Sequence, residues 1–497
     1  MSNRPETNKQ SCPVYKKCGG CQLQNLSYPE QLEFKQKKVE KLLKRFCTVE
    51  KIIGMKTPYH YRNKVQAAFY TDKKGKIISG VYQSGSHHVV GIDSCQTEDV
   101  IADKIIVAVR KLLPSFRMTT YNEDTGKGFL RHILVKRGFA TNQIMLVLVT
   151  GTPVFPSKNN FVKAILKQFP EITTIVQNIN PYRTNLVLGD NQKVLYGKGY
   201  IEDILCGCRF RISPKSFYQI NPVQTEVLYG KAIDFANLKG NETVLDTYCG
   251  IGTIGIIAAK NGAGNVIGAE LNGDAVRDAI VNARANNLKN IRFYKADAGE
   301  FMREAADEDE KPDVVFMDPP RAGSDRKFLD SLIKMSPKKV VYVSCNPETL
   351  ARDLAYLTQN SPYKAQKIQP VDMFPHTAHI ETVVLLSHKK PDGHINVKVE
   401  FGEGEGKVPL DNIAKRAEEY KPKERVTYKM IKEYIEAKYG FKVHTAYIAE
   451  VKRDLGLPMY DAPNAVEELK QPRKHPTAEK VEAIKDALRY FEIMEEI

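Results

Sequence analysis

The chain has 497 residues, 42% of them hydrophobic and 27% charged, and lengths of about 100–200 residues per domain predict two to four domains. It contains no apolar run near the roughly 18 residues that span a bilayer and no signal-peptide core, so we expect a cytoplasmic protein without a membrane partner. Lysine and arginine exceed aspartate and glutamate by 74 − 59 = 15, which favours polyanionic partners such as nucleic acids.

Three of the nine cysteines stand close together near the N-terminus. Cys12, Cys18 and Cys21 form a C-x5-C-x2-C pattern, in which two glycines let the backbone turn tightly enough for neighbouring sulfurs to converge. Tetrahedral sulfur sites hold zinc or an iron–sulfur cluster and normally take four donors, and Cys95 is the nearest candidate for the fourth. The spacing does not separate zinc from iron, and three unrelated buried thiols are the alternative.

The first two hundred residues otherwise predict one helix and a β-rich platform. Residues 29–46 place Leu32, Val39 and Leu43 on one helical face and lysines on the opposite face, which lies in solvent or against phosphates. From about residue 50 to 205, short runs such as HILVKRG and IMLVLVTG predict antiparallel β structure with one or two helices. We therefore expect a first domain at residues 1–205.

From about residue 206 to 390, strands alternate with helices, which is typical of an α/β fold with a doubly wound parallel sheet. One strand ends at Asp246, and a glycine-rich turn leads into a helix near Thr253. The next strand ends 24 residues later at Glu270, where a carboxylate can accept hydrogen bonds from both ribose hydroxyls. A third ends at Asp297, where it can meet an adenine amino group. With no P-loop lysine, this pattern favours S-adenosylmethionine (SAM) over a dinucleotide.

The later strands of this region carry the groups that could react. Asp318 ends a strand and is followed by two prolines that fix the turn, and Arg321 then stands where methyltransferases acting on exocyclic amines commonly place an aromatic residue. Cys345 ends the next strand, so the topology places it at the same edge of the sheet, and Glu381 begins the last strand. The alternative for Cys345 is a small buried hydrophobic residue.

A thiol, a carboxylate and an electrophilic methyl group at one edge indicate alkylation of an unreactive carbon. Carbon 5 of a uracil becomes nucleophilic when a thiolate adds to carbon 6, and a base then removes the hydrogen from carbon 5. Because a free thiol has a pKa of about 8.5, we expect Cys345 to be partly exposed and helped by a cation such as Arg321.

The order of several motifs resembles the SAM-dependent RNA uracil-5-methyltransferase family, in the bacterial type that modifies ribosomal or transfer RNA. The resemblance extends from Cys12 to about Leu386 and rests on CGGCQLQNLSYPEQLEFK, SFYQIN, LDTYCGIGTIG, GAELN, DPPRAG, VSCNPETLARDL and PHTAHIETVVLL. It implies a Rossmann-like SAM-dependent methyltransferase domain at residues 206–390, preceded by an iron–sulfur and β-rich RNA-binding domain.

The resemblance also implies roles for individual residues. Cys345 would be the nucleophile and Glu381 the base that takes the proton from carbon 5. The implied cofactor contacts are Gln219, Tyr248, Glu270 and Asp318, and the implied ligands of a [4Fe–4S] cluster are Cys12, Cys18, Cys21 and Cys95. Phe217 is a candidate for packing against the base or the adenosine, with an ordinary core aromatic as the alternative.

Residues 391–497 form a C-terminal extension, whereas many relatives that act on ribosomal RNA have a small β-barrel before the cluster. Residues 427–438 and 445–455 predict two amphipathic helices joined by a turn at Gly440. They form either a helix-turn-helix-like element, with Lys452 and Arg453 exposed, or a small helical bundle.

We therefore expect a monomeric enzyme that transfers a methyl group from SAM to carbon 5 of a uridine in RNA, with 23S ribosomal RNA as the first candidate and transfer RNA as the second. RNA cytosine-5 methylation is the enzymatic alternative, although those enzymes typically place a cysteine after the proline of the DPP-like motif, where this chain has none. A non-catalytic iron–sulfur RNA-binding protein is the other alternative. Because no step moves electrons, we expect the cluster to hold the fold or to contact RNA.

Overall fold

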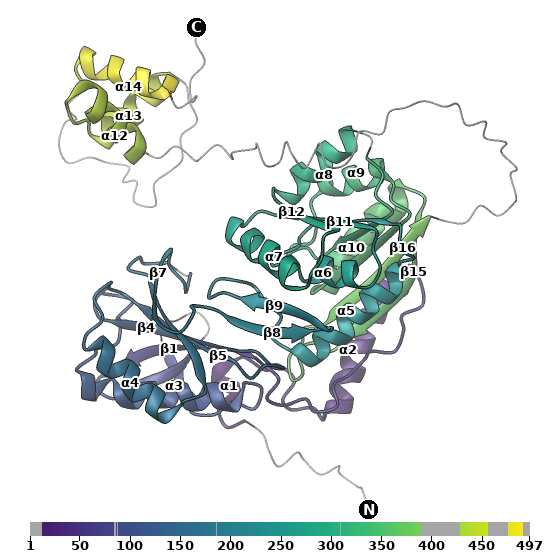
Figure 1. The fold of residues 1–497 in the computed structure, drawn as a ribbon, viewed down its shortest axis with the longest axis horizontal. Coiled ribbons are helices and arrows are strands. Elements are labelled where there is room, and N and C mark those ends of the chain that lie inside the picture. The colour runs from purple at the N-terminus through teal and green to yellow at the C-terminus, as the bar shows by residue number, and fades with distance from the viewer. Residues whose placement is uncertain are drawn as a thin grey trace, which may run out of the picture. The chain divides into compact units, whose positions relative to one another are not determined.

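The computed structural model describes residues 12–83, 86, 88–184, 186–308, 310–388, 428–455 and 476–490. The chain divides into two compact units, Met1–Glu418 and Glu419–Ile497. The first unit contains both the β-rich region and the strand–helix region that the sequence predicts (Figure 1). No helix in the described part of the chain is long and apolar enough to cross a membrane.

A seven-stranded sheet forms the N-terminal part of the first unit, in the order β3-β2-β1-β4-β5-β6-β7. Neighbouring strands are antiparallel, as predicted, except β5 and β6, which are parallel and joined through α4. Helices α3 and α4 cover one face, where their apolar residues join a buried cluster with β1, β4, β5 and β6. The elements are β1 (Lys64–Thr71), β2 (Ile77–Tyr82), β3 (Val89–Gly91), α3 (Val100–Leu112), η1 (Pro114–Phe116), β4 (Leu130–Arg137), β5 (Ile144–Thr150), α4 (Lys158–Gln168), β6 (Ile172–Ile179) and β7 (Asn191–Tyr196).

The second sheet has the order β12-β11-β10-β13-β14-β16-β15 and confirms the Rossmann-like α/β prediction. Its first five strands are parallel, whereas β16 runs antiparallel to both β14 and β15. The strands are β10 (Thr243–Asp246), β11 (Asn265–Glu270), β12 (Ile291–Lys295), β13 (Val314–Met317), β14 (Lys339–Ser344), β15 (Tyr363–Val371) and β16 (Glu381–His388). This catalytic sheet places strand ends at Asp246 and Glu270 as predicted, while β12 stops two residues before Asp297.

Helices cover both faces of the catalytic sheet because its strands are apolar on both sides. Their residues enter two buried clusters, one with α5, α6 and α7 and the other with α2, α8, α9 and α10. These helices are α5 (Pro222–Ala236), α6 (Thr253–Lys260), α7 (Gly273–Ala285), α8 (Ala298–Asp307), α9 (Arg326–Met335) and α10 (Pro347–Asn360).

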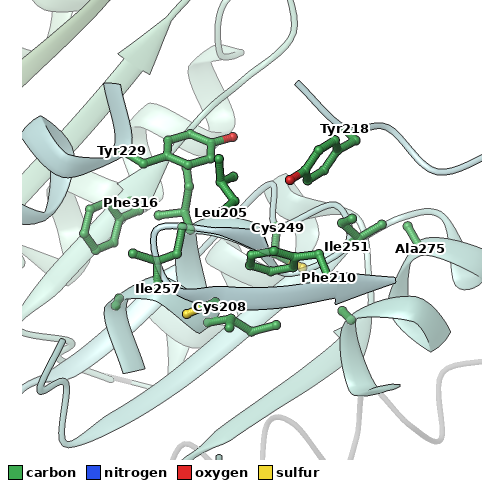
Figure 2. Packing of buried hydrophobic residues seen from close by; sticks show 14 of the residues in the cluster. Leu205, Cys208, Phe210, Tyr218, Tyr229, Cys249, Ile251, Ile257, Ala275 and Phe316 are labelled. Carbon is green, nitrogen blue, oxygen red and sulfur yellow. The ribbon is translucent and has the colours of Figure 1, made fainter. Parts of the chain in front are cut away.

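A hairpin of β8 (Ile201–Leu205) and β9 (Cys208–Ile212) crosses the residue at which we expected the boundary between the two domains. Its side chains belong to the core of the catalytic sheet. Figure 2 shows Phe210 and Cys208 of the hairpin packed in one cluster with Ile257 and with Cys249 of the glycine-rich turn. The hairpin therefore joins the catalytic core from its first strand onward.

Helix α2 (Tyr28–Leu43) follows the short α1 (Tyr15–Cys18) and begins at a capping box formed by Ser27 and Glu30. Its buried stripe contains Lys35, which stands four residues before Val39 on the apolar face of the helix. The Nζ atom of Lys35 donates to Oδ1 of Asp372 at 2.5 Å, and both side chains are fully buried. Lys35 therefore belongs to the apolar face of α2 and not to the opposite face, for which we expected solvent or phosphates.

The second unit contains α12 (Tyr428–Tyr439), α13 (Thr445–Asp454) and α14 (Ala478–Tyr490). The first two confirm the predicted helices, and Gly440 adopts the left-handed conformation (φ 73°) that the turn requires. Apolar residues of all three helices, among them Ile435, Ile448 and Ile484, form one core. Lys452 is buried, which contradicts its predicted exposure, because α14 supplies a face that the two-helix interpretation lacked.

The buried ion pair predicts a large effect of one substitution. Asp372→Ala leaves the Lys35 charge without its partner, so we expect the free energy of unfolding in urea to fall by about 3–5 kcal/mol. Lys37→Ala in the same helix, which removes an exposed pair with Glu33, should stay close to wild type. Equal losses in the two variants would contradict this role of the buried pair.

Candidate active site

The carboxyl edge of the catalytic sheet gathers the side chains that the sequence selected. Asp246 ends β10 and Glu270 ends β11, while Asp318 and Cys345 directly follow β13 and β14. In parallel strands these ends meet at one edge of the sheet, which is where α/β proteins bind ligands. The predicted convergence is therefore present.

Antiparallel pairing brings Glu381 to the same edge as Cys345. Ser344 of β14 pairs with Thr382 of β16, so the residue after Ser344 and the residue before Thr382 lie side by side at the end of the ladder. Cys345 is partly exposed, as expected, whereas Glu381 is buried. The thiol and the carboxyl group are therefore neighbours, and the thiol remains open to a substrate.

The electrostatics of this edge favour uncharged groups. Burial, followed by the nearby Glu381 and Asp318, raises the pKa of the Cys345 thiol to about 11, and Arg321 acts in the opposite direction. Burial and Asp318 also hold the pKa of Glu381 well above its usual value. Arg321 thus lowers the pKa of Cys345, as predicted, but its effect is smaller than the combined effect of burial and the two carboxyl groups. Cys345 is a thiol at neutral pH in the protein by itself.

Asn346 fixes the backbone on either side of the nucleophile candidate. Its Oδ1 accepts from the backbone N–H of Glu348 and caps α10, while its Nδ2 donates to the carbonyl of Arg321 at 3.1 Å. The hydroxyl of Thr349 donates to the same carbonyl at 3.3 Å. The loop after β13 and the start of α10 are therefore tied together around Cys345.

A cavity adjoins this edge at the glycine-rich turn. Glycine is required at position 252, where φ is 81° and a Cβ atom would come within 2.6 Å of the Phe293 ring. The cavity is lined by Leu205, Phe217, Tyr218, Gln219, Tyr229, Tyr248, Cys249, Gly250, Ile251, Thr253, Ile254 and Asp318. Three of the five predicted cofactor residues therefore lie on one cavity wall.

The other two predicted cofactor residues lie close to strand ends but outside that lining. The Glu270 carboxylate accepts from the backbone N–H groups of Gly250 at 3.1 Å and Asn272 at 2.8 Å, which holds it against the glycine-rich turn. Asp297 is exposed and caps α8 by accepting from the N–H groups of Gly299 and Glu300. Glu270 is thus held at the turn, while the adenine contact of Asp297 stays a prediction.

The charge of the cavity fits a cationic nucleoside. Asp246 is buried, its Oδ2 accepts from the N–H of Gly255 at 2.8 Å, and its Oδ1 has no hydrogen-bond partner among the described residues. Burial, Asp318 and Glu270 raise the pKa of Asp246 to about 7, and burial raises that of Asp318 to about 7. These carboxyl groups would be stabilised in their ionised form by a positive ligand, and SAM carries a sulfonium and an ammonium group.

Two aromatic residues line the cavity: Phe217, for which the sequence left two interpretations open, and Tyr229, which the sequence did not single out. Phe217 is 63% exposed and lines the cavity, which rejects the core alternative. Tyr229 of α5 is buried on the same wall, and burial followed by the charge of Asp318 raises the pKa of its hydroxyl. Nothing in its helical spacing distinguishes Tyr229 from an ordinary core residue.

The three N-terminal cysteines share a neighbourhood. Burial raises the pKa of Cys18 and Cys21. Cys12 raises the pKa of both further, Cys18 raises that of Cys21, and Arg62 lowers both. Gly20 leaves space for the sulfur, because a Cβ atom there would lie 3.3 Å from the Cys18 Sγ. The segment therefore gathers three thiols beside one guanidinium group.

Cys95 and Cys18 both lie close enough to the Glu98 carboxyl group for its charge to affect their pKa. Burial and then Glu98 raise the pKa of Cys95 to about 11, and Glu98 also acts on Cys18. The donor types thus fit a thiolate-bound cluster. In the part of the chain that the structure describes, however, no group of three or more histidine, cysteine, aspartate or glutamate side chains is arranged to hold a metal ion. The cluster on these four cysteines therefore stays a prediction.

Comparison with known proteins relates this arrangement to RNA methyltransferases. The profile of the family described as tRNA (Uracil-5-)-methyltransferase matches residues 183–389. A Bacillus cereus protein is 44% identical over 77% of this chain and 84% of its own length, and a Listeria monocytogenes protein is 47% identical over 76% and 83%. Both are named as uncharacterized RNA methyltransferases.

A solved structure has the same fold over most of the first unit. The Pyrococcus abyssi tRNA (uracil-54, C5)-methyltransferase in complex with S-adenosyl-L-homocysteine is 30% identical, covers 76% of this chain and 87% of its own, and has a TM-score of 0.62. With this fold and with relatives that match over most of their length, the chain belongs to the SAM-dependent RNA uracil-5-methyltransferase family and is an RNA methyltransferase.

Proposed function

We propose that this methyltransferase modifies carbon 5 of a uridine in RNA through a transient covalent bond between Cys345 and carbon 6 of the base. The observation that carries the proposal is the position of Cys345 beside Glu381 at the edge that also bears Asp318 of the cofactor cavity. We take 23S ribosomal RNA as the first candidate substrate.

The chemistry uses these two side chains in order. The Cys345 thiol passes its proton to the Asp318 carboxylate, which leaves Glu381 ionised, and the sulfur bonds to carbon 6, which makes carbon 5 a nucleophile as an enolate forms. When bound, SAM would supply the electrophilic methyl group that carbon 5 takes up, with cleavage of the sulfonium–methyl bond and S-adenosyl-L-homocysteine as the leaving group. Glu381 then removes the proton from carbon 5, the electrons of that C–H bond restore the carbon 5–carbon 6 double bond, and the Cys345 sulfur leaves as a thiolate.

The environment of Glu381 suits the role of base. A carboxyl group with an ordinary pKa is too weak a base to accept a proton from carbon readily, whereas a buried one with a raised pKa is stronger. Glu381 is buried beside Asp318, so its carboxylate gains more from protonation than an exposed one does.

The reacting base must leave its stack, which costs a few kcal/mol and is cheapest in loops and single strands. Phe217 offers an exposed ring at the cavity, and the Lys64 Nζ lies 6.0 Å from the centre of that ring. A base can stack on this ring while the lysine faces a phosphate. This supports a splayed-out nucleotide as the substrate form.

Transfer RNA is the second candidate substrate, because the Pyrococcus abyssi relative is named for uracil-54 of transfer RNA. Cytosine methylation is disfavoured because Arg321, and not a cysteine, follows the two prolines after Asp318. A protein without activity is disfavoured by the adjacent Cys345 and Glu381.

We also propose that Cys12, Cys18, Cys21 and Cys95 hold a [4Fe–4S] cluster with a structural role. The residues after Cys21 support it, since the N–H of Leu23 donates to the His376 carbonyl at 2.9 Å. The N–H of Ala378 donates to Gln22 Oε1 at 3.2 Å. Holding the cysteine segment therefore also holds the connection that leads to Glu381.

Trapping on RNA tests the function and the nucleophile. On a 23S transcript containing 5-fluorouridine, the wild-type protein with SAM should stay covalently attached, because carbon 5 then bears no removable proton. Cys345→Ala should give no adduct and no methyluridine by mass spectrometry. Glu381→Gln is the matched variant, and it should accumulate the same adduct on ordinary uridine. Methylation by Cys345→Ala would exclude the covalent route.

The raised pKa of Cys345 predicts its reactivity in the protein by itself. Because the thiolate is the reactive form and the pKa is about 11, alkylation by iodoacetamide should rise about tenfold per pH unit from pH 7.5 to 9.5. At pH 8 it should be at least tenfold slower than in urea-unfolded protein, as followed by mass spectrometry of the Cys345 peptide. A plateau below pH 9 would show that Arg321 outweighs burial.

The cluster proposal predicts a chromophore. Protein purified without oxygen should absorb visible light, and Cys18→Ser should lose this absorbance and melt at a lower temperature, because three thiolates do not complete the ligand set. Cys47→Ser, outside the four cysteines, is the control. A methylation rate that follows the oxidation state of the cluster would contradict a structural role.

A further inference from the structure

A second cavity lies in the N-terminal sheet, and none of its lining residues belongs to the catalytic sheet. It has a volume of about 310 Å³, within the range of small-ligand sites. Aromatic side chains supply much of its wall, together with His88 and three polar residues of the loop before β4, Asn122, Glu123 and Asp124. The residues that matter here are Phe69, Tyr70, Tyr82, Tyr121, Asn122 and Glu123.

One wall of this cavity is rigid. Buried Arg131 donates from Nε and Nη2 to the two oxygens of Glu123, at 3.0 and 2.7 Å, and from Nη1 to the carbonyls of Asn180 and Tyr182. Its guanidinium group also lies 4.5 Å from the centre of the Tyr121 ring. Glu123 and Tyr121 are therefore held in place before any ligand arrives, which lowers the entropy cost of binding.

Two buried polar atoms at this place lack a partner among the described residues. The Tyr121 hydroxyl belongs to a side chain only 4% exposed, and His132 Nδ1 to one only 5% exposed. The His132 ring stands edge-on to Tyr82, with centroids 5.9 Å apart, and burial lowers its pKa to about 4, so it is neutral. Such groups cost free energy unless a ligand or water bonds to them.

Counting lone pairs shows what a ligand would meet. Among the described residues, Glu123 Oε1 accepts from Arg131 and, at 3.5 Å, from the Tyr82 hydroxyl, whereas Oε2 accepts only from Arg131. A carboxylate accepts about four hydrogen bonds, so Oε2 has room for one N–H. The Asn122 Oδ1 is used by the backbone N–H groups of Asp124 and Thr125, which leaves its NH₂ to donate. The cavity thus offers an acceptor, a donor and aromatic faces.

We propose that this cavity binds an unpaired, amino-bearing nucleobase of the RNA substrate, at a nucleotide other than the one that is methylated. The proposal rests on the proposed function, since it takes RNA as the substrate. The base stacks on Tyr82 or Tyr70, gives its amino N–H to Glu123 and accepts from Asn122, as proteins read splayed-out bases. RNA is thereby held at two separate unpaired nucleotides.

In the described part of the chain, the lining contains two carboxyl groups, those of Glu123 and Asp124, and no lysine or arginine, so the positive charge that would meet phosphates lies beside the cavity. The carboxylate of Glu123 is already paired with Arg131. Exposed Lys127 pairs across the loop with Asn122, and exposed Arg183 donates to the carbonyl of Asp124 at 2.6 Å. Two cations therefore flank the loop, where phosphates on either side of a bound base would lie within their reach.

Equilibrium binding of RNA tests this site. Tyr82→Ala should weaken binding of an unmodified 23S transcript by about fivefold to about a hundredfold, in filter binding with S-adenosyl-L-homocysteine present, because a stacking face is lost. KM for RNA should rise similarly while kcat stays within about twofold. Tyr196→Ala is the matched control, since Tyr196 is 43% exposed on β7 of the same sheet and does not line the cavity. Equal Kd values for the two variants would overturn the proposal.

Two further measurements keep the outcome clear. Asn122→Ser retains an oxygen for the turn but removes the NH₂ group, so it should weaken binding severalfold even if Tyr82→Ala is unstable. A transcript carrying 6-thioguanosine should photo-crosslink to the peptide containing Tyr82, and crosslinks confined to residues 206–390 would overturn the site. Absence of methyluridine would reject the proposed function, whereas an unchanged Kd with normal methylation rejects only this second site.

Discussion

A buried ion pair, Lys35 with Asp372, is the constraint on which the geometry of the active edge depends. Both side chains are fully buried, and Lys35 also donates to the Phe374 carbonyl at 3.0 Å. Asp372 accepts a second bond, from the Tyr28 hydroxyl at 2.8 Å, so both of its oxygens are used. Two such charges stay together because either one alone would be uncompensated in the interior. The pair fixes helix α2 against the chain that runs from β15 to Glu381.

The connection between β15 and β16 has few regular backbone bonds of its own, and side chains from elsewhere hold it. Tyr61 and Gln31 bond to Pro375 and His376, while Asn221 and Gln224 of the α5 start bond to the carbonyls of Met373 and Asp372. Asn63, which directly precedes β1, also donates to the carbonyl of Gln219 at 3.2 Å. Hydrogen bonds therefore link the N-terminal sheet, the cavity lining at Gln219 and this connection. Glu381 is consequently positioned by residues scattered over most of the first unit.

The sequence predicted local features of this site well and long-range features poorly. The ends of β10 and β11 and the start of α6 follow from alternating apolar runs and a glycine-rich turn, which are local patterns. The spacing of Leu32, Lys35 and Val39 puts Lys35 on the apolar face of α2, but no pattern within the helix reveals its partner Asp372, which is 337 residues away. The same limit applies to the direction of β16 and to the pKa of Cys345, since both depend on neighbours that only the folded chain brings together.

The raised pKa values of the edge have a functional meaning when taken together. Burial keeps Cys345 a thiol and favours protonated Glu381, so without its ligands the protein holds Cys345, the proposed nucleophile, in the unreactive form. A thiol of this kind resists oxidation and alkylation, which require the thiolate. Positive charge placed beside Asp246 and Asp318 favours ionised carboxylates, and a carboxylate can then accept the proton of the thiol. Burial thus keeps Cys345 in the thiol form, and for the same reason formation of its thiolate would depend on a bound ligand in the cavity.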